Sequence, residues 1–159
     1  MEYSYQFTHA IVRKPAESIN NGLRAVDIGK PNYDQMMLDH SDYVDALISA
    51  GAQIIELSPL EKYPDAQFVE DTALCLPEGV ILMRPGAPSR LGEVEEIAPK
   101  LRDLFIKVYK IDEPGHVEGG DILVTGKEIL IGRSARTDKS GVSQLSEIII
   151  SLGYVLREV

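Results

Sequence analysis

The sequence predicts an α/β fold assembled from repeated units, and three observations support this prediction. Segments whose apolar residues recur at helical spacing begin near residues 32, 91 and 140, and a strand-like segment follows each. Pairs of strand-like segments joined by short turns precede the second and third helices. The length of 159 residues and the hydrophobic content of 44% suit one domain with a core, so we expect a single domain over residues 1–159. Repeats of this kind usually stack or close around an axis.

The first part of the chain predicts a strand, a loop, a helix and a second strand. Residues 7–15, FTHAIVRKP, have the short-period apolar pattern of a strand that ends at a proline. Residues 17–31 are rich in Asn, Gly and Asp and predict a loop. Residues 32–51 predict a helix, because a proline precedes its apolar pattern and a glycine stands where the helix should end. QIIELSP, residues 53–59, follows as a strand.

The middle of the chain predicts a hairpin, a helix and a strand. The hairpin consists of FVEDTALCLPEG, residues 68–79, and VILMRPG, residues 80–86, with Phe68 and Val69 beginning its first strand. A helix is expected over residues 93–105, although a proline in its interior disfavours one. Residues 106–111, IKVYKI, predict a strand.

The last part predicts the same order again. DILVTG and EILIGR form a hairpin that turns near Gly126 and Lys127. Residues 140–153 predict a helix with Gly153 as its stop, and YVLREV, residues 154–159, predicts a last strand.

Charge and composition disfavour several classes of partner. The net charge is −9, and no cluster of lysine and arginine offers the basic surface that nucleic-acid binding requires. No apolar run approaches the length that spans a membrane, and the first residues do not resemble a secretory signal, so we expect a cytoplasmic protein. A single cysteine allows no disulfide within the chain and no thiolate metal cluster. Nothing in the sequence implies a metal or an organic cofactor.

The stretch KYPDAQFVED, residues 62–71, is the first candidate site. It places Asp65, Glu70 and Asp71 around the apolar pair Phe68 and Val69. Three carboxylates beside apolar side chains can hold a flat cation, and the alternative is a solvated loop. Neighbouring residues of a strand point to opposite faces, so Glu70 and Asp71 can face one pocket only if the chain bends there.

The second candidate, RPGAPSRLGE at residues 84–93, is a proline- and glycine-rich loop that carries Arg84 and Arg90. An arginine guanidinium can bind a carboxylate through two parallel hydrogen bonds. The alternative is structural: Ser89 caps the following helix, and Glu93 lies in its first turns. Both interpretations can hold together.

Two further candidates lie later in the chain. In PGHVEGGD, residues 114–121, Glu118 precedes two glycines, where backbone can approach a ligand closely, and His116 lies beside it. In GRSARTD, residues 132–138, Arg133 and Arg136 follow a strand, and ligands often gather at strand ends. The alternative for the first is a turn that carries acidic residues, and the alternative for the second is ordinary surface arginines.

Cys75 is the only sulfhydryl, and the sequence favours a structural role for it. It lies between two leucines in a predicted strand, so we expect a buried thiol with a raised pKa and little reactivity. The three histidines are scattered, and no familiar nucleophile, metalloprotease or phosphate-binding motif is present.

Taken together, the motifs resemble dimethylarginine dimethylaminohydrolases of the guanidine-modifying (pentein) superfamily. PDAQFVED, RPGAPSRLGE, VEGGD and SARTD occur in that family's order and at similar spacing, and FTHAIVRKP and GLRAVDIGKP resemble its N-terminal strand and active-site loop. The resemblance covers nearly the whole chain. Arginine deiminases are relatives that typically carry an arginine where this chain reads FVED, which favours the methylarginine hydrolases.

The resemblance implies a fold and a chemistry. The fold is a pentein-type α/β propeller of five ββαβ units around a pseudo-five-fold axis, of which about three are expected here. In the family, a cysteine attacks the guanidinium carbon, an amine leaves, water then releases citrulline, and a histidine serves as general acid and base.

The resemblance also implies roles for individual residues. Glu118 would be the catalytic-site carboxylate beside the histidine, and Arg90 and Arg136 would bind the α-carboxylate of the ligand. Asp138 stands where the family often has asparagine. The remaining substrate-binding positions are Asp65 and Glu70 near the guanidinium, Asp71 in support, Phe68 as a wall and Leu23 from the active-site loop.

The family places its catalytic histidine shortly after the segment that here reads YVLREV, and its cysteine near the C-terminus of a longer chain. Neither lies within these 159 residues, and Cys75 does not match the nucleophile motif. We therefore expect the substrate-binding part of a methylarginine hydrolase, inactive by itself. The alternatives are a guanidinium-binding pseudoenzyme, a protein that self-assembles through exposed strand edges, and a relative of arginine deiminases or amidinotransferases.

Overall fold

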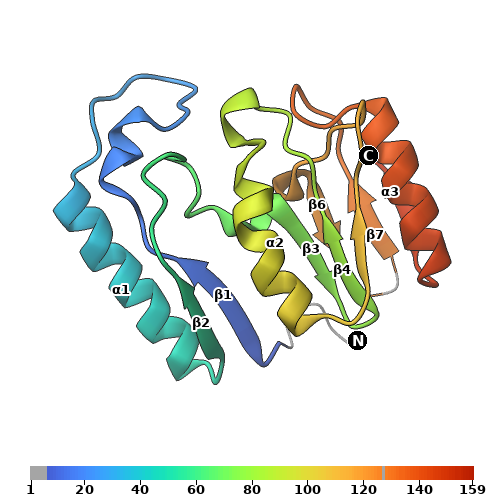
Figure 1. The fold of residues 1–159 in the computed structure, drawn as a ribbon, viewed down its shortest axis with the longest axis horizontal. Helices are drawn as coiled ribbons and strands as arrows, with labels where there is room; N and C mark the ends of the chain where they lie inside the picture. The colour runs from blue at the N-terminus through green and yellow to red at the C-terminus, as the bar shows by residue number, and fades with distance from the viewer. Residues whose placement is uncertain (1–6, 127) are drawn as a thin grey trace. The chain divides into compact units, whose positions relative to one another are not determined.

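The computed structural model describes residues 7–126 and 128–159, and it shows an α/β protein. Two compact units are present, residues 7–69 and residues 70–159 (Figure 1). Whether the chain forms one domain stays a prediction. None of the described helices is both long and apolar enough to cross a lipid bilayer.

The unit of residues 7–69 is a parallel strand pair connected by a helix. Strand β1 (His9–Arg13) pairs with β2 (Gln53–Leu57), and α1 (Tyr33–Ser49) runs alongside them (Figure 1). The short 3-10 helix η1 (Glu17–Asn21) lies in the loop between β1 and α1.

The predicted ends of α1 are confirmed. Asn32 caps its first turn, because its Oδ1 accepts the Gln35 N–H at 3.0 Å. Gly51 has a φ of +93° just beyond the helix, a conformation that glycine adopts without strain.

The unit of residues 70–159 contains two three-stranded sheets of the same build. In the first, β3 (Ala73–Leu76) pairs antiparallel with β4 (Gly79–Leu82), and β4 pairs in parallel with β5 (Val108–Lys110). Helix α2 (Glu93–Leu104) connects the two parallel strands. It continues through the exposed Pro99, because its apolar face is buried through Val94, Ile97, Ala98 and Leu101.

The second sheet repeats this order. Strand β6 (Ile122–Val124) pairs antiparallel with β7 (Glu128–Ile131), and β7 pairs in parallel with β8 (Val155–Glu158) across helix α3 (Lys139–Ser151). Gly126 takes the positive φ, +87°, of the predicted turn, and Lys127 lies outside the described residues. The three sheets and three helices confirm the predicted α/β class, and the described strands form no closed barrel, consistent with an incomplete propeller.

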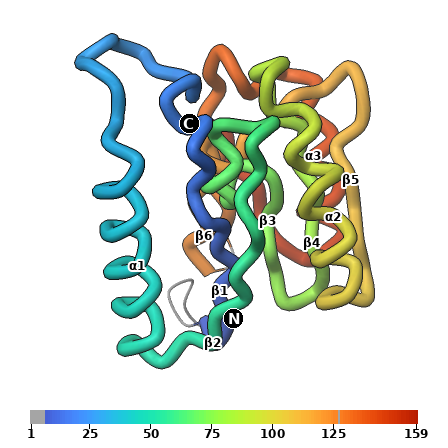
Figure 2. Tube along the Cα trace, turned by 60° about the vertical axis from the view of Figure 1, so that its left-hand side comes forward, coloured from blue at the N-terminus to red at the C-terminus, as the bar shows by residue number. Residues whose placement is uncertain are grey.

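One hydrophobic cluster joins both sheets of this unit with α3. Its fully buried members include Ile81 of β4, Ile129 and Ile131 of β7, and Leu145 and Ile149 of α3. Figure 2 shows the Cα trace of the same chain in a second view. Burial of these side chains is the main stabilising term of the unit.

Two local predictions are wrong. Val69–Thr72 forms the 3-10 helix η2 and is not the start of a strand, so β3 begins only at Ala73. Gly92, and not Ser89, is the N-cap of α2, because the chain enters that helix from another short 3-10 helix, η3 (Pro88–Arg90). Glu93 does lie in the first turn of α2, as predicted.

Cys75 differs from the prediction in one respect. Its side chain is exposed and not buried. Partial desolvation of the sulfur nevertheless raises the pKa of the thiol to about 11, so the direction predicted for the pKa is confirmed.

Alkylation of Cys75 is therefore expected to be slow despite its exposure. The thiolate is the reacting form, and a pKa of about 11 leaves roughly a hundredth as much thiolate at pH 8 as an ordinary thiol has. The rate of iodoacetamide labelling of the folded chain, compared with that of the same chain in denaturant, measures the effect. Equal rates in both states would contradict it.

Candidate functional site

The guanidinium of Arg90 is the centre of a buried charge cluster within residues 70–159. Arg90 ends η3 and its side chain is 3% exposed. Its Nε donates to both carboxylate oxygens of Glu93 at 3.1 Å, and its Nη2 donates to Glu93 Oε2 at 2.8 Å. Its Nη1 donates to Asp71 Oδ2. Burial alone lowers the pKa of Arg90, but the bonds to Glu93 and Asp71 outweigh it and raise that pKa.

Glu93 is the partner that sequence reasoning did not identify as part of a site. It lies three residues after Arg90 and is 2% exposed. The spacing could have indicated the pair, because residues three apart face each other at a helix start. Two further acids, Glu95 and Glu96, share the first turn and are exposed, so the sequence alone does not show which acid is buried.

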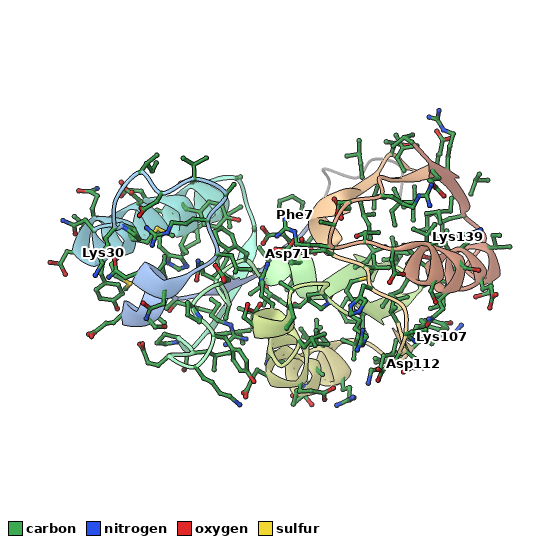
Figure 3. All side chains as sticks on the ribbon, turned by 90° about the horizontal axis from the view of Figure 1, so that it is seen from above. Phe7, Lys30, Asp71, Lys107, Asp112 and Lys139 are labelled. Atoms are coloured by element: carbon green, nitrogen blue, oxygen red, sulfur yellow. The ribbon has the colours of Figure 1, made fainter. Side chains whose placement is uncertain are left out.

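Asp71, labelled in Figure 3, is held at both oxygens. Its Oδ1 accepts the Gly120 N–H at 3.0 Å, while its Oδ2 accepts from Arg90. The bend that the sequence required between Glu70 and Asp71 is supplied by η2. Burial raises the pKa of Glu70, and the neighbouring Asp71 charge raises it further, although the Glu70 side chain is exposed overall.

Gly119 is the reason that the two acidic segments meet. A Cβ at this position would overlap the carbonyl oxygen of Glu70 and lie 2.9 Å from its carbonyl carbon. The sequence indicated a close approach of a ligand at these glycines, and this stays a prediction; the close approach that the structure shows at Gly119 is to the chain's own backbone. This approach brings Glu118 and Gly120 to the Asp71 carboxylate.

Glu118 is the buried carboxylate of the cluster and is 2% exposed. Its Oε2 lies 2.7 Å from Arg136 Nε. Its Oε1 lies 3.6 Å from Arg90 Nη1 and is buried without a hydrogen-bond partner among the described residues. Burial raises the pKa of Glu118, the Asp71 charge adds to this, and Arg136 and Arg90 oppose it.

A hydroxyl network fixes the loop that carries Arg136. Asp121 Oδ2 accepts from Ser134 Oγ at 2.7 Å and from Thr137 Oγ1 at 2.5 Å. The fully buried Thr137 hydroxyl accepts the Glu118 N–H at 3.1 Å, and the Arg136 N–H donates to Ser134 Oγ. Thr137 and Ser134 therefore set the backbone on either side of Arg136.

Asp138, where the family often has asparagine, caps α3. Its Oδ1 accepts the Gly141 N–H at 2.8 Å. Burial would raise the pKa of Asp138, but this bond and neighbouring backbone donors outweigh burial and lower the pKa.

In the unit of residues 7–69, the structure brings Leu23 and Asp65 together. The Leu23 N–H donates to both oxygens of the buried Asp65 carboxylate at 3.1 Å. The Leu23 side chain and the Phe68 ring are both exposed. Of the site residues predicted in this unit, Leu23 and Asp65 are thus joined by a hydrogen bond from backbone to carboxylate, and Phe68 presents an exposed ring.

The other candidate residues make contacts of their own. Arg84 Nη1 lies 2.8 Å from His116 Nε2, and Arg133 pairs with Glu158 at 2.5 Å. Across residues 7–126 and 128–159, no group of three or more His, Cys, Asp or Glu side chains is arranged to hold a metal ion. The cluster of Asp71, Arg90, Glu118 and Arg136 is the arrangement of predicted residues that the structure assembles within one unit.

A comparison with protein families places most of the chain in one family. The family model of arginine deiminase matches residues 35–157, which include all four residues of the cluster. The chain belongs to the arginine deiminase family.

Curated relatives of this arginine deiminase family chain include two dimethylarginine dimethylaminohydrolases. The protein from Pseudomonas aeruginosa is 42% identical over 144 residues, which is 90% of this chain and 57% of the relative. The protein from Streptomyces coelicolor is 34% identical over 145 residues, 91% of this chain and 56% of the relative. The chain thus spans little more than half the length of these relatives.

Solved structures agree with the sequence comparison. A mutant of the P. aeruginosa enzyme complexed with citrulline has a TM-score of 0.95 and 40% identity, covering 98% of this chain and 61% of that one. The N-terminal domain of ArgZ, a cyanobacterial arginine dihydrolase, has a TM-score of 0.78 at 17% identity, which shows a shared fold. The resemblance drawn from the motifs, to dimethylarginine dimethylaminohydrolases of the pentein superfamily, is confirmed.

Proposed function

We propose that this chain supplies the guanidinium-binding cluster of a hydrolase that converts Nω-methylated arginine to citrulline and an amine. The observation that carries the proposal is Glu118, whose Oε1 is buried without a hydrogen-bond partner among the described residues. The family resemblance implies that this carboxylate lies beside the catalytic histidine, and the proposal adds that it also faces the guanidinium of the ligand. A buried carboxylate oxygen is costly unless a donor satisfies it, and a guanidinium N–H is a strong donor to carboxylates. The dimethylarginine dimethylaminohydrolase relatives support methylarginine as the ligand.

The contribution of these residues is binding and orientation. Asp71, with both oxygens held, has a fixed position beside Glu118, and Coulombic attraction between carboxylates and a planar cation offsets the cation's desolvation. Fixing the plane of the guanidinium presents its central carbon to a nucleophile from one face. A cysteine nucleophile and a histidine are the groups that the family resemblance implies for that attack, and Cys75, with its raised pKa, does not suit the role.

Exposure and contacts favour different roles for Arg136 and Arg90. Arg136 is 52% exposed, so its guanidinium is accessible to a ligand carboxylate. The Arg90 side chain is buried, and carboxylates of the chain bind its Nε, Nη1 and Nη2. These contacts favour Arg136 as the group that binds the α-carboxylate of the ligand and favour Arg90 as the group that positions Asp71.

Glu118→Gln is expected to weaken binding of Nω,Nω-dimethylarginine at least tenfold, roughly the worth of one charge-assisted hydrogen bond. Calorimetric titration of the 159-residue chain at pH 7.5 measures this. Glu95→Gln, on an exposed side chain of α2, is the matched control and should bind like the unchanged chain. Saturable binding that is equal in the two variants, or no binding by the unchanged chain, would refute the proposal.

The fold of Glu118→Gln is expected to be retained at neutral pH. A glutamate whose folded-state pKa is raised contributes stability below its unfolded pKa, and that contribution is lost as pH rises through the folded value. Burial therefore makes the ionised form of Glu118 the less favourable form for the fold. Glutamine cannot ionise, so a loss of binding reports on the site.

The arginine deiminase family model favours one alternative, in which unmethylated arginine is the ligand. Competition between arginine and dimethylarginine on the same chain separates the two. A binding protein without turnover is the remaining candidate, and formation of citrulline would exclude it. A cytoplasmic location and self-association through strand edges stay predictions.

A further inference from the structure

Glu118 lies where the chain has little conformational restraint of its own. It is extended, with a φ of −109° and a ψ of 135°, just before the short 3-10 helix η4 (Gly119–Asp121). Two glycines follow it, and glycine restrains the backbone less than any other residue. The Glu118 side chain is nevertheless buried, so contacts from elsewhere in the chain hold its backbone in place.

Both backbone hydrogen-bonding groups of Glu118 lead to Asp121. The Glu118 carbonyl accepts the Asp121 N–H at 3.1 Å. The Glu118 N–H donates to Thr137 Oγ1 at 3.1 Å, and this hydroxyl in turn donates to Asp121 Oδ2 at 2.5 Å. Asp121 therefore closes a ring of hydrogen bonds with Glu118 through the hydroxyl of Thr137.

The carboxylate of Asp121 orients the Thr137 hydroxyl. A hydroxyl has one hydrogen and two lone pairs, so it accepts the Glu118 N–H only when its own hydrogen points elsewhere. The Asp121 carboxylate binds that hydrogen, and a hydrogen bond to an ionised acceptor is stronger than one between neutral groups. Thr137 is 1% exposed, so bulk water does not compete for its hydroxyl.

We propose that Asp121 is a positioning residue that holds Glu118 in place through the Thr137 hydroxyl. The proposal rests on the proposed function, because it takes Glu118 as the carboxylate that meets the guanidinium of the ligand. Binding groups work only when they are held within about 0.5 Å of the productive geometry. Breaking the ring of hydrogen bonds should therefore lower the affinity without changing the carboxylate that meets the ligand.

Thr137→Val removes the hydroxyl and keeps the size of the buried side chain. The affinity for Nω,Nω-dimethylarginine should fall about tenfold, roughly the worth of one hydrogen bond. Thr137→Ser restores the hydroxyl and should bind within about threefold of the unchanged chain. Thr125→Val is the matched control, because it removes an exposed hydroxyl that donates to the Glu128 carbonyl at 2.9 Å, and it should bind like the unchanged chain. Calorimetric titration measures each affinity.

A double variant tests whether Asp121 acts through Thr137. Asp121→Ala should weaken binding about tenfold or more, because the Thr137 hydroxyl is no longer oriented. Asp121→Ala combined with Thr137→Val should bind no more weakly than Asp121→Ala alone, since substitutions within one hydrogen-bond network are not additive. Fully additive losses would show that the two residues act independently, which contradicts the proposal.

Hydrogen exchange of the Glu118 amide, followed by NMR, tests the ring without a ligand. In Asp121→Ala and in Thr137→Val this amide should exchange about tenfold faster relative to the amide of Ile129, which is fully buried in β7. A general loss of stability would accelerate both amides alike and leave their ratio unchanged. The ratio therefore reports on the position of Glu118 and not on the stability of the whole unit.

The proposed function and the positioning role fail in different ways. If the unchanged chain does not bind dimethylarginine, the proposed function is refuted, and the exchange ratio alone decides the role of Asp121. If the unchanged chain binds, an unchanged affinity in Asp121→Ala or in Thr137→Val refutes the positioning role alone. An unchanged exchange ratio in these variants refutes that role in either case.

Discussion

Replacement of Arg90 by methionine is expected to lower the free energy of unfolding by about 3–5 kcal/mol at neutral pH, the usual cost of removing one partner from a buried ion pair. Arg90 satisfies Glu93, which is 2% exposed, and one oxygen of Asp71. Methionine replaces the aliphatic stem of the side chain but leaves these carboxylates without their cation. Urea denaturation followed by circular dichroism measures the change.

The loss should become smaller as the pH is lowered. Arg90 lowers the pKa of Glu118, so its removal raises a pKa that burial has already raised above the ordinary value of 4.5. A carboxyl group with a raised folded-state pKa stabilises the fold at low pH and loses that contribution as the pH rises through the folded value. The deficit of Arg90→Met is therefore smallest in acid and grows as the pH rises above the raised folded-state pKa of Glu118.

Two control variants separate the effect of the buried cluster from the effect of removing an arginine elsewhere. Arg133→Met removes an exposed arginine with an ion pair of its own and should cost about 0–1 kcal/mol. The double variant Arg90→Met with Glu93→Gln should recover part of the loss, because one uncompensated charge is removed. Equal losses in Arg90→Met and Arg133→Met would show that the cluster does not stabilise the fold.

Replacement of Gly119 by alanine is expected to cost about 1–3 kcal/mol or more, the range for inserting a methyl group into a filled space. The added Cβ would overlap the carbonyl oxygen of Glu70, and a backbone atom cannot move aside as the end of a flexible side chain can. The shift would also separate Gly120 from the Asp71 oxygen that accepts its N–H. Binding of dimethylarginine should therefore weaken along with stability.

Gly132→Ala is the matched control for this substitution. A Cβ at Gly132 meets nothing within 4 Å, and this glycine does not have a positive φ. Thermal unfolding of both variants gives the comparison. If both melt at the same temperature, the close approach of Gly119 to Glu70 is not tight in solution.

The regular elements could be predicted because their signals are local. Asn32 and Gly51 mark the ends of α1 within a few residues of the apolar pattern that they enclose. The hairpins are signalled by apolar strands with a glycine at the turn, as at Gly126. The resemblance to a known family then supplied the propeller arrangement of the repeats that these signals indicate.

The conformation of FVED could not be predicted, because its cause lies far away in the chain. An apolar pair followed by two acids and then by Thr72, Ala73 and Leu74 was interpreted as a single strand, but Gly119 packs against the Glu70 backbone and η2 forms instead. The same holds for Cys75, whose neighbours Leu74 and Leu76 pack on the core while the thiol faces outward. An alternating strand buries only one of its two faces.

The candidate site, too, was predictable where its signals are local and unpredictable where they depend on distant parts of the chain. Glu118 and Arg136 could be selected as candidates from the sequence, because glycines and a strand end flank them. Their pairing could not, since it depends on the hydroxyl network of Asp121, Ser134 and Thr137. The burial of Glu93 could not be predicted either, because three acidic residues share the first turn of α2 and the sequence does not show which of them is buried.

Each sheet is built from one uninterrupted stretch of chain, residues 9–57, 73–110 and 122–158, and this has a consequence for synthesis on the ribosome. All strands of one sheet are available before the next sheet begins, so pairing can proceed in the order in which the chain emerges. The burial of the sheet of residues 73–110 is completed later than its pairing. Its core-facing side chains share a hydrophobic cluster with α3, and α3 emerges about thirty residues after the last of them; they are Leu76, Ile81 and Ile111. The nascent chain therefore passes through a stage in which a finished sheet still exposes its apolar face to chaperones or to other chains.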